Sequence, residues 1–160
     1  MPTGRSLALL ALAFAFLTLT GVNAEPKPDF TGTWTRTEPA LQSGSSYMER
    51  VEQHGSDLKV VVDSSGTFAG FHLEHEYTIG GGETSTKDSE GRTRTVSVDW
   101  DGETLVFVTS TTEGANVTTV REVWSLPADG QTLNRSRTTT SWRGTTVEKS
   151  AFARQSRDKH

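Results

Sequence analysis

Residues 92–111 read RTRTVSVDWDGETLVFVTST and decide the fold class, because they form two alternating segments around a tight turn. In the first segment Val96, Val98 and Trp100 share one face, since successive side chains of a strand point to opposite sides. Asp101-Gly102 supplies the positive φ angles that the favoured two-residue hairpin turn needs. This stretch therefore predicts an antiparallel β-hairpin.

The same two-residue rhythm continues along the chain in both directions. Turn signals separate short alternating segments, so we expect strands at residues 31–37, 47–53, 58–63, 71–79, 92–100, 104–111, 118–126, 131–140 and 145–154. Residues 80–91 are expected to form a loop, and residues 41–53 are the one segment with ambiguous periodicity. Regular strands with local turns favour an all-β fold, a single antiparallel up-and-down β-barrel of about 8–10 strands. A sandwich of two sheets is the alternative.

The first 24 residues have the order of a secretory signal peptide. One positive charge, Arg5, precedes an apolar run over residues 7–17, and Val22-Asn23-Ala24 is a small-residue cleavage pattern. The run is shorter than the roughly 20 apolar residues of a membrane span, so a membrane anchor or a buried first helix is the weaker interpretation. We expect a periplasmic or secreted protein with a signal at residues 1–24, a barrel domain at 25–154 and a disordered tail at 155–160.

Charge and composition exclude several classes of function. The chain carries 16 Lys and Arg against 20 Asp and Glu, and this net charge of −4 argues against nucleic acid as a partner. The absence of Cys excludes disulfides, thiol catalysis and Cys-ligated metals. The sequence contains neither a nucleophile elbow nor a phosphate-binding loop, and it indicates no cofactor and no catalytic residue.

Three motifs carry a resemblance to a known superfamily. The Gly-x-Trp of DFTGTW (residues 29–34) resembles the opening strand of lipocalins and fatty-acid-binding proteins, the calycins. The stretches WDGETLV (100–106) and TTVREV (118–123) are similar to the late hairpins of the fatty-acid-binding type. With WSLPADGQTL (124–133), the whole pattern is similar to exported bacterial proteins called lipocalin-like. The resemblance implies that Trp34 packs across the closed base of a barrel.

The resemblance also implies a site for an anionic group on the strand that contains Arg121. In fatty-acid-binding barrels an Arg in this context points inward and holds a carboxylate, and Lys149 stands where a second basic residue is expected. Ala151 replaces the Tyr that usually completes the clamp. Strand alternation leaves two registers open, because an inward Arg121 places Val120, Trp124 and Leu126 outside and the opposite register buries them with Glu122.

Two histidines have competing interpretations. His75 lies on the apolar face of residues 71–79, where it either meets a ligand or is an ordinary core histidine. His72, Glu74 and Glu76 share the other face, which suits a divalent cation but equally an exposed polar surface. No fourth ligand is evident, and we expect no metal.

We expect a monomeric, non-catalytic binder of a small hydrophobic or amphipathic molecule in the barrel mouth. The expected ligand contacts are Trp34, His75, Tyr77, Trp100, Arg121, Trp124 and Lys149. One alternative is a structural or interaction domain whose barrel is filled by its own side chains. Another is a barrel enzyme, for which Glu122 and His75 are the available acid or base.

Overall fold

Ten β-strands make up the fold in the computed structural model, which describes residues 26–66 and 70–156. They are β1 (Gly32–Glu38), β2 (Ser46–His54), β3 (Asp57–Ser65), β4 (Phe71–Thr78), β5 (Thr84–Lys87), β6 (Thr93–Asp101), β7 (Thr104–Glu113), β8 (Asn116–Ser125), β9 (Thr132–Ser141) and β10 (Gly144–Arg154). The expected signal peptide at residues 1–24 and the last residues of the expected tail, 157–160, lie outside the described residues. In the described part of the chain, no helix has the length and apolar character needed to span a bilayer.

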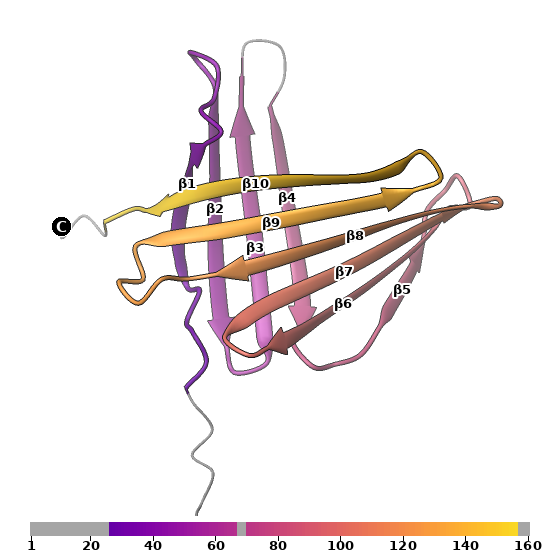
Figure 1. Ribbon diagram of the computed structural model, residues 1–160, viewed down its shortest axis with the longest axis horizontal. Helices are drawn as coiled ribbons and strands as arrows, with labels where there is room; N and C mark the ends of the chain where they lie inside the picture. The colour runs from indigo at the N-terminus through magenta and orange to yellow at the C-terminus, as the bar shows by residue number, and fades with distance from the viewer. Residues whose placement is uncertain (1–25, 67–69, 157–160) are drawn as a thin grey trace, which may run out of the picture.

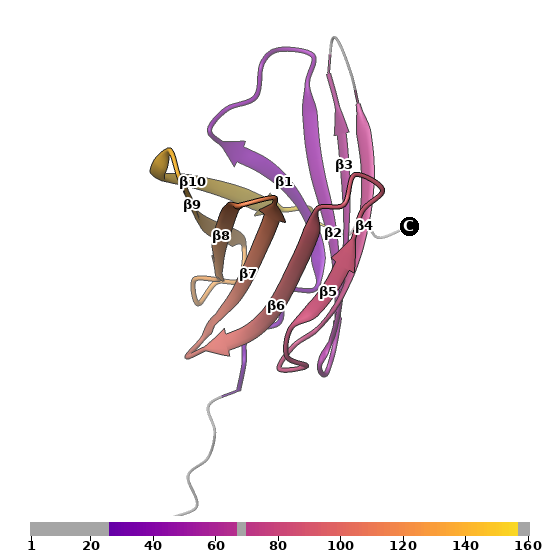
Figure 2. The ribbon, with the colours of Figure 1, turned by 90° about the vertical axis from the view of Figure 1, so that its right-hand side faces the viewer.

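All ten strands belong to one antiparallel sheet, in the order β4-β3-β2-β1-β10-β9-β8-β7-β6-β5. β1 pairs with β10, from Trp34↔Arg154 to Glu38↔Ala151, so the first and last strands meet as expected. The sheet bends over on itself, and β1–β4 cross β6–β10 as two facing layers (Figure 1; Figure 2). Because hydrogen bonding runs continuously through β1 and β10, the fold is barrel-like and is not a sandwich of two separate sheets.

The sheet is open between β4 and β5, which corrects the expectation of a fully closed barrel. These two strands are the edges of the sheet and share no hydrogen-bonded ladder. The three glycines at 80–82 turn the chain away after β4, and β5 has only four residues with which to return alongside it. At the turn, the Gly80 N–H donates to the Val98 carbonyl of β6 at 2.8 Å, which connects the end of β4 to the strand next to the β5 edge.

The nine expected strands are confirmed, with ends that differ by one or two residues. β6 pairs with β7 as far as Asp101↔Thr104, so the turn residues are Gly102 and Glu103, one position later than the expected Asp101-Gly102. Gly102 has a φ of 59°, but Asp101 lacks the positive φ that the expected turn gave it. β5 is an unexpected addition, because it falls within the segment 80–91 and its four residues are polar and exposed. The ambiguous segment 41–53 contains no helix, and its second half forms β2.

Trp34 closes one end of the barrel, as the resemblance implies. Its side chain is fully buried, and its indole N–H donates to the Phe30 carbonyl at 3.0 Å. The Arg154 guanidinium lies 4.2 Å from the Trp34 ring centroid and donates to the Gly130 carbonyl at 2.7 Å. Gln155, expected in the disordered tail, continues the pairing with β1 by donating its backbone N–H to the Thr33 carbonyl at 2.8 Å. The start and the end of the domain are therefore tied together at its base.

Candidate functional site

A cavity of about 810 Å³ lies between the two layers of the sheet. Its lining comes from β1–β4 and β6–β10, because alternate residues of each strand point inward. The volume falls within the range of roughly 300–1,000 Å³ that is usual for small-molecule sites. The side chains of the protein therefore leave room for a ligand inside the barrel.

One wall of this cavity is apolar. It is formed by side chains of β3, β4 and β7, namely Val60, Val62, Phe71, Leu73 and Phe107. Phe71 and Leu73 are 48% and 46% exposed, since β4 is an edge strand. The Phe107 ring packs against Trp124, with ring centroids 4.6 Å apart, and against Tyr77 at 5.4 Å. This wall offers aliphatic and aromatic surface to the apolar part of a ligand.

A buried ion pair joins β2 to β9 across the interior. Arg135 Nη1 donates to Glu49 Oε1 at 2.7 Å, and its Nη2 donates to the second carboxylate oxygen. The side chains of Arg135 and Glu49 are only 9% and 1% exposed. The guanidinium lies 4.0 Å from the Trp124 ring centroid and 4.5 Å from that of Phe152. The bidentate pair and the two rings fix the guanidinium at the cavity wall.

Glu122, on β8, places a second carboxylate next to the Arg135–Glu49 ion pair. Its Oε1 accepts the Trp124 indole N–H at 2.5 Å and lies 3.6 Å from Arg135 Nη1. The Trp124 indole is therefore held between a carboxylate and a guanidinium. Among the described residues that line the cavity, no hydrogen bond joins a Ser, Thr or His side chain to a carboxylate. The described site thus lacks the paired nucleophile and base that covalent catalysis by a hydroxyl group requires.

Cationic side chains outnumber carboxylates on the inner face of the sheet, four to three. The cations are Arg36, Arg94, Arg135 and Arg137, and the carboxylates are Glu49, Glu122 and Glu148. Lys149 follows the inward Glu148 on β10, so its side chain points to the outer face. In residues 26–66 and 70–156, Arg36, Arg94 and Arg137 take part in no ion pair. The positive cavity is a local feature, because the net charge of the whole chain is −4.

Two guanidinium groups also have unused donors. The Nε–H groups of Arg36 and Arg135 are buried and have no acceptor within the described structure. A buried donor without an acceptor costs about 1–3 kcal/mol, so such groups need an explanation. Burial, the largest cause, and the nearby charges of Arg137 and Arg36 lower the pKa of Arg135 to about 9. The guanidinium remains charged at neutral pH, and an anion in the cavity would relieve the repulsion among the three groups.

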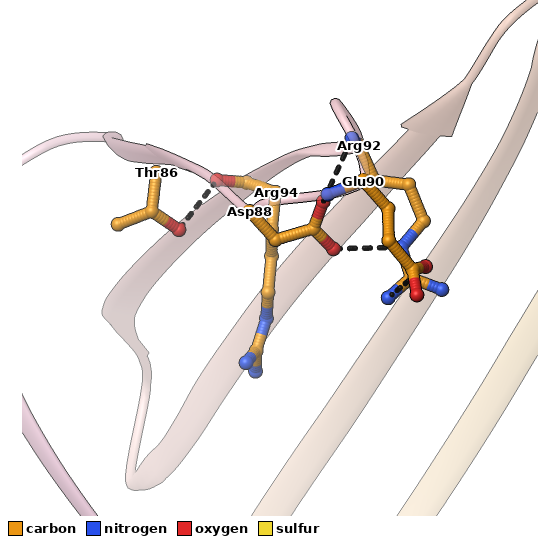
Figure 3. Close-up of polar contacts among 5 residues, drawn as sticks. All are labelled: Thr86, Asp88, Glu90, Arg92 and Arg94. Atoms are coloured by element: carbon orange, nitrogen blue, oxygen red, sulfur yellow. Dashed lines mark hydrogen bonds and ion pairs between the residues drawn. The ribbon is translucent and has the colours of Figure 1, made fainter.

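Arg94 lines the cavity next to a turn whose other charges are already paired. Asp88 accepts hydrogen bonds from Arg92 Nε at 2.7 Å and from the backbone N–H groups of Glu90 and Arg92. The hydrogen bond from Arg92 lowers the pKa of the Asp88 carboxyl, which keeps it ionised. Figure 3 shows the Arg94 side chain extending away from this cluster, with only its backbone carbonyl bound to Thr86. The Arg94 guanidinium therefore adds a positive charge to the cavity lining.

The structure brings together three of the seven expected ligand contacts inside the cavity, namely His75, Tyr77 and Trp124. Lys149 alternates with the inward Glu148 and Ser150 on β10, so its side chain lies on the outer face. Trp34 and Trp100 belong to the base of the barrel, where the Trp100 ring stacks on Phe30 with centroids 6.0 Å apart. Arg121 lies on the outer face, with its side chain 50% exposed and its Nη2 3.6 Å from Asp101 Oδ2. Arg121 thus does not reach the cavity.

The register of β8 explains the position of Arg121. Trp124 is 3% exposed and packs its ring against Phe107 and Phe30, and this burial turns alternate residues Val120 and Glu122 inward. Arg121 must then point outward, because neighbouring residues of a strand face opposite sides. Burial of the large indole decides between the two registers that the sequence leaves open.

His75 and Tyr77 contribute neutral polar groups to the site. Burial, followed by the charge of Arg94, lowers the pKa of His75, so its imidazole is uncharged at neutral pH. Burial raises the pKa of Tyr77, which keeps its hydroxyl protonated. The two rings lie side by side, with centroids 5.9 Å apart. Both groups are available as hydrogen-bonding partners and add no charge to the cavity.

The other face of β4 is an exposed polar surface. His72 Nδ1 lies 2.7 Å from Asp63 Oδ1, and Lys59 Nζ lies 2.6 Å from Glu74 Oε1. Glu76 is 3.9 Å from the same Lys59 nitrogen. Cross-strand pairs with β3 therefore engage the three side chains considered above as cation ligands, and no metal-binding group of three or more His, Asp or Glu occurs in the described ranges.

Sequence reasoning missed Glu49 and Arg135, the centre of the site. Arg135 lies in NRSRTTTS (134–141), a stretch without apolar residues and therefore without a signal for the inward face. The one available clue is parity, because Leu133 is fully buried and Arg135 is two residues further on. The sequence gives even less indication that Glu49 is buried, since a carboxylate in a strand is normally assigned to the surface.

Comparisons with known proteins identify the fold. No protein-family model matches this chain, and no curated protein sequence matches it either. Among solved structures, apo lipid binding protein 8 of Caenorhabditis elegans is 10% identical with a TM-score of 0.53, and the match covers 79% of this chain and 95% of that one. Zebrafish ileal bile acid-binding protein complexed with cholic acid is 14% identical with a TM-score of 0.51, and the match covers 79% and 98%.

A third similar structure has a name that mentions no ligand. Secretory abundant heat soluble protein 4 from Ramazzottius varieornatus is 14% identical with a TM-score of 0.51, over 79% of this chain and 95% of that one. Together the three comparisons show a calycin-like β-barrel fold. At these identities the likeness concerns the fold alone.

Proposed function

We propose that this protein binds, without catalysis, a small and partly apolar molecule that carries a negatively charged group. The observation that carries the proposal is the cavity of about 810 Å³, in which an apolar wall faces an excess of cationic side chains. The apolar part of the ligand lies against Phe71, Leu73 and Phe107, and the anionic group lies near Arg36 and Arg137.

The named neighbours support a binding role. One is called a lipid binding protein, and another was solved with cholic acid, which is a carboxylic acid with an apolar ring system. The cavity volume counts against the alternative of a filled barrel with a purely structural role. The alternative of a barrel enzyme is supported only by the presence of Glu122 and His75 in the cavity lining, where no paired base accompanies them.

A titration with anilinonaphthalene sulfonate tests the proposal. This probe combines an apolar ring system with one anionic group, and its emission rises when it enters an apolar site. We expect saturable binding to the folded protein at one site. Thr109→Phe, which places a ring inside the cavity, is expected to weaken binding about tenfold or more, a loss of about 1.4 kcal/mol for each factor of ten.

Thr138→Phe is the matched control, because Thr138 is paired with Arg121 on the outer face of the sheet. It adds the same ring outside the cavity and is expected to leave the affinity unchanged. Equal effects of the two substitutions, or no saturable binding at all, would show that the cavity is not the site.

We also propose that the protein is exported. The support is the sequence of residues 1–24, with its charged start, short apolar centre and small-residue end. The intact mass of the protein from its own source is expected to correspond to a chain that starts at Glu25. A mass that includes Met1 or the apolar segment would refute export by this route.

A further inference from the structure

The backbone of β4 has hydrogen-bonding groups that face the open side of the sheet. The Ile79 N–H donates to the Ser56 carbonyl on the β3 side at 2.7 Å, whereas the next N–H, that of Gly80, donates to Val98 of β6. In an antiparallel sheet the backbone groups of a strand alternate between its two sides. Counting back from Gly80 in steps of two gives the residues of β4 whose N–H groups face the open side, namely His72, Glu74 and Glu76. Within residues 26–66 and 70–156, no acceptor pairs with these three N–H groups.

Space for another strand lies beside this edge. β4 and β5 diverge from the Gly80–Val98 hydrogen bond, so the opening between them widens toward the start of β4 (Figure 1). A hollow of about 400 Å³ beside Tyr77 of β4, Thr84 of β5 and Val96 of β6 shows that side chains do not fill the opening. Neighbouring strands lie about 4.8 Å apart, so an extended segment can pair with the first part of β4.

β4 lacks the features that usually protect an exposed edge strand. It has eight residues, contains no Lys or Pro, and pairs with β3 without a bulge. β5, the other edge of the sheet, has only four residues, and one of them is Lys87. The edge of β4 is therefore suited to strand addition, in which a peptide binds through main-chain hydrogen bonds.

The two faces of β4 determine which side chains an added strand needs. On the outer face of β2–β4, alternation places two cations, Arg50 and Lys59, two histidines and five carboxylates. The carboxylates are Glu52, Asp57, Asp63, Glu74 and Glu76. On the inner face, Phe71 and Leu73 are about half exposed at the edge. Basic side chains therefore suit the outer face of an added strand, and apolar side chains suit its inner face.

We propose that the edge of β4 binds an extended peptide in which basic and apolar residues alternate. The basic side chains lie beside Glu74 and Glu76, and the apolar side chains lie beside Phe71 and Leu73. A second copy of β4 fits this edge less well, because two acidic rows would then lie next to each other. The interaction does not depend on whether the cavity holds a small ligand.

Two peptides of identical composition test the proposal. One is acetylated and amidated Lys-Val-Lys-Val-Lys-Val-Lys-Val, and the other, Lys-Lys-Val-Val-Lys-Lys-Val-Val, has the same charge without the alternation. Titration of the unaltered protein at fixed ionic strength is expected to give a dissociation constant at least about tenfold lower for the alternating peptide. Equal constants would show that only charge attracts the peptides, which would overturn the proposal.

Amide hydrogen exchange tests where the peptide binds. The N–H groups of His72, Glu74 and Glu76 are expected to exchange rapidly in the free protein and at least about tenfold more slowly with saturating peptide. Slower exchange in β5 in place of β4 would overturn the proposal. So would protection of the β4 edge in the free protein that rises with protein concentration, because a second copy would then occupy the edge.

Proline substitution tests the role of the backbone. Glu74→Pro removes an N–H group that faces the open side, so the pairing with β3 is retained. It is expected to weaken binding of the alternating peptide at least about tenfold relative to Glu74→Gln, which removes the same charge and keeps the N–H. Ser85→Pro, on the β5 edge, is the matched control and is expected to leave the affinity unchanged. If Glu74→Pro fails to fold, Glu76→Pro and Glu76→Gln provide the same comparison, and undiminished binding by the proline variant would overturn the proposal.

Discussion

Replacement of Glu49 by Gln is expected to lower the free energy of unfolding by about 3–5 kcal/mol. Glu49 is 1% exposed and accepts two hydrogen bonds from the buried Arg135, so the substitution leaves a guanidinium in the interior without its counter-charge. Glu122, at 3.6 Å, is already bound to the Trp124 indole and can compensate only in part. Urea denaturation followed by circular dichroism measures the change.

Asp101→Asn is the matched control for this prediction. It also removes a carboxylate from an ion pair, but Asp101 is 75% exposed and lies 3.6 Å from Arg121. Its effect is expected to stay within about 0.5 kcal/mol. A Glu49→Gln variant no less stable than Asp101→Asn would show that the pair does not stabilise the interior. The double variant Glu49→Gln/Arg135→Met is expected to lose less than the sum of the two single variants.

Trp34→Ala is expected to destabilise the protein by about 3–5 kcal/mol. The indole is fully buried, and its removal leaves a cavity at the base of the barrel and takes away the ring on which the Arg154 guanidinium stacks at 4.2 Å. The hydrogen bond to the Phe30 carbonyl is lost as well. The same denaturation experiment measures the loss.

Trp142→Ala provides the comparison, because Trp142 is 71% exposed at the turn between β9 and β10. A change within about 0.5 kcal/mol is expected for this surface position. Similar losses for the two tryptophans would contradict the assignment of Trp34 to the closed base.

The fold followed from local signals that are strong in this chain. Alternation in residues 92–111 and the Asp101-Gly102 turn predict β6 and β7 without any tertiary information. β5 was not predictable in this way, since four polar residues after three glycines carry no periodicity. The open edge between β4 and β5 is a consequence of this short strand, and a strand pattern gives no measure of how far a sheet closes.

The site was less predictable than the fold, because its charged residues are buried against the usual preference. The sequence allows Trp124 to face either the inside or the outside of the barrel. Its contacts with Phe107 and Phe30 show that it faces inward, so Arg121 faces outward. The inward guanidinium is Arg135 on the neighbouring strand, where no apolar pattern marks the face. Sequence alternation therefore predicted the barrel, and the tertiary contacts determined which charged side chains line its cavity.

The proposed ligand site is the space between the two layers of the sheet. Nuclear Overhauser effects between anilinonaphthalene sulfonate and the methyl groups of a valine-labelled sample show whether a ligand enters it. We expect contacts to Val60 and Val62, which line the cavity, and none to Val117 or Val147, which are 50% and 60% exposed on other parts of the sheet. Contacts confined to Val117 and Val147 would show that the ligand binds outside the cavity.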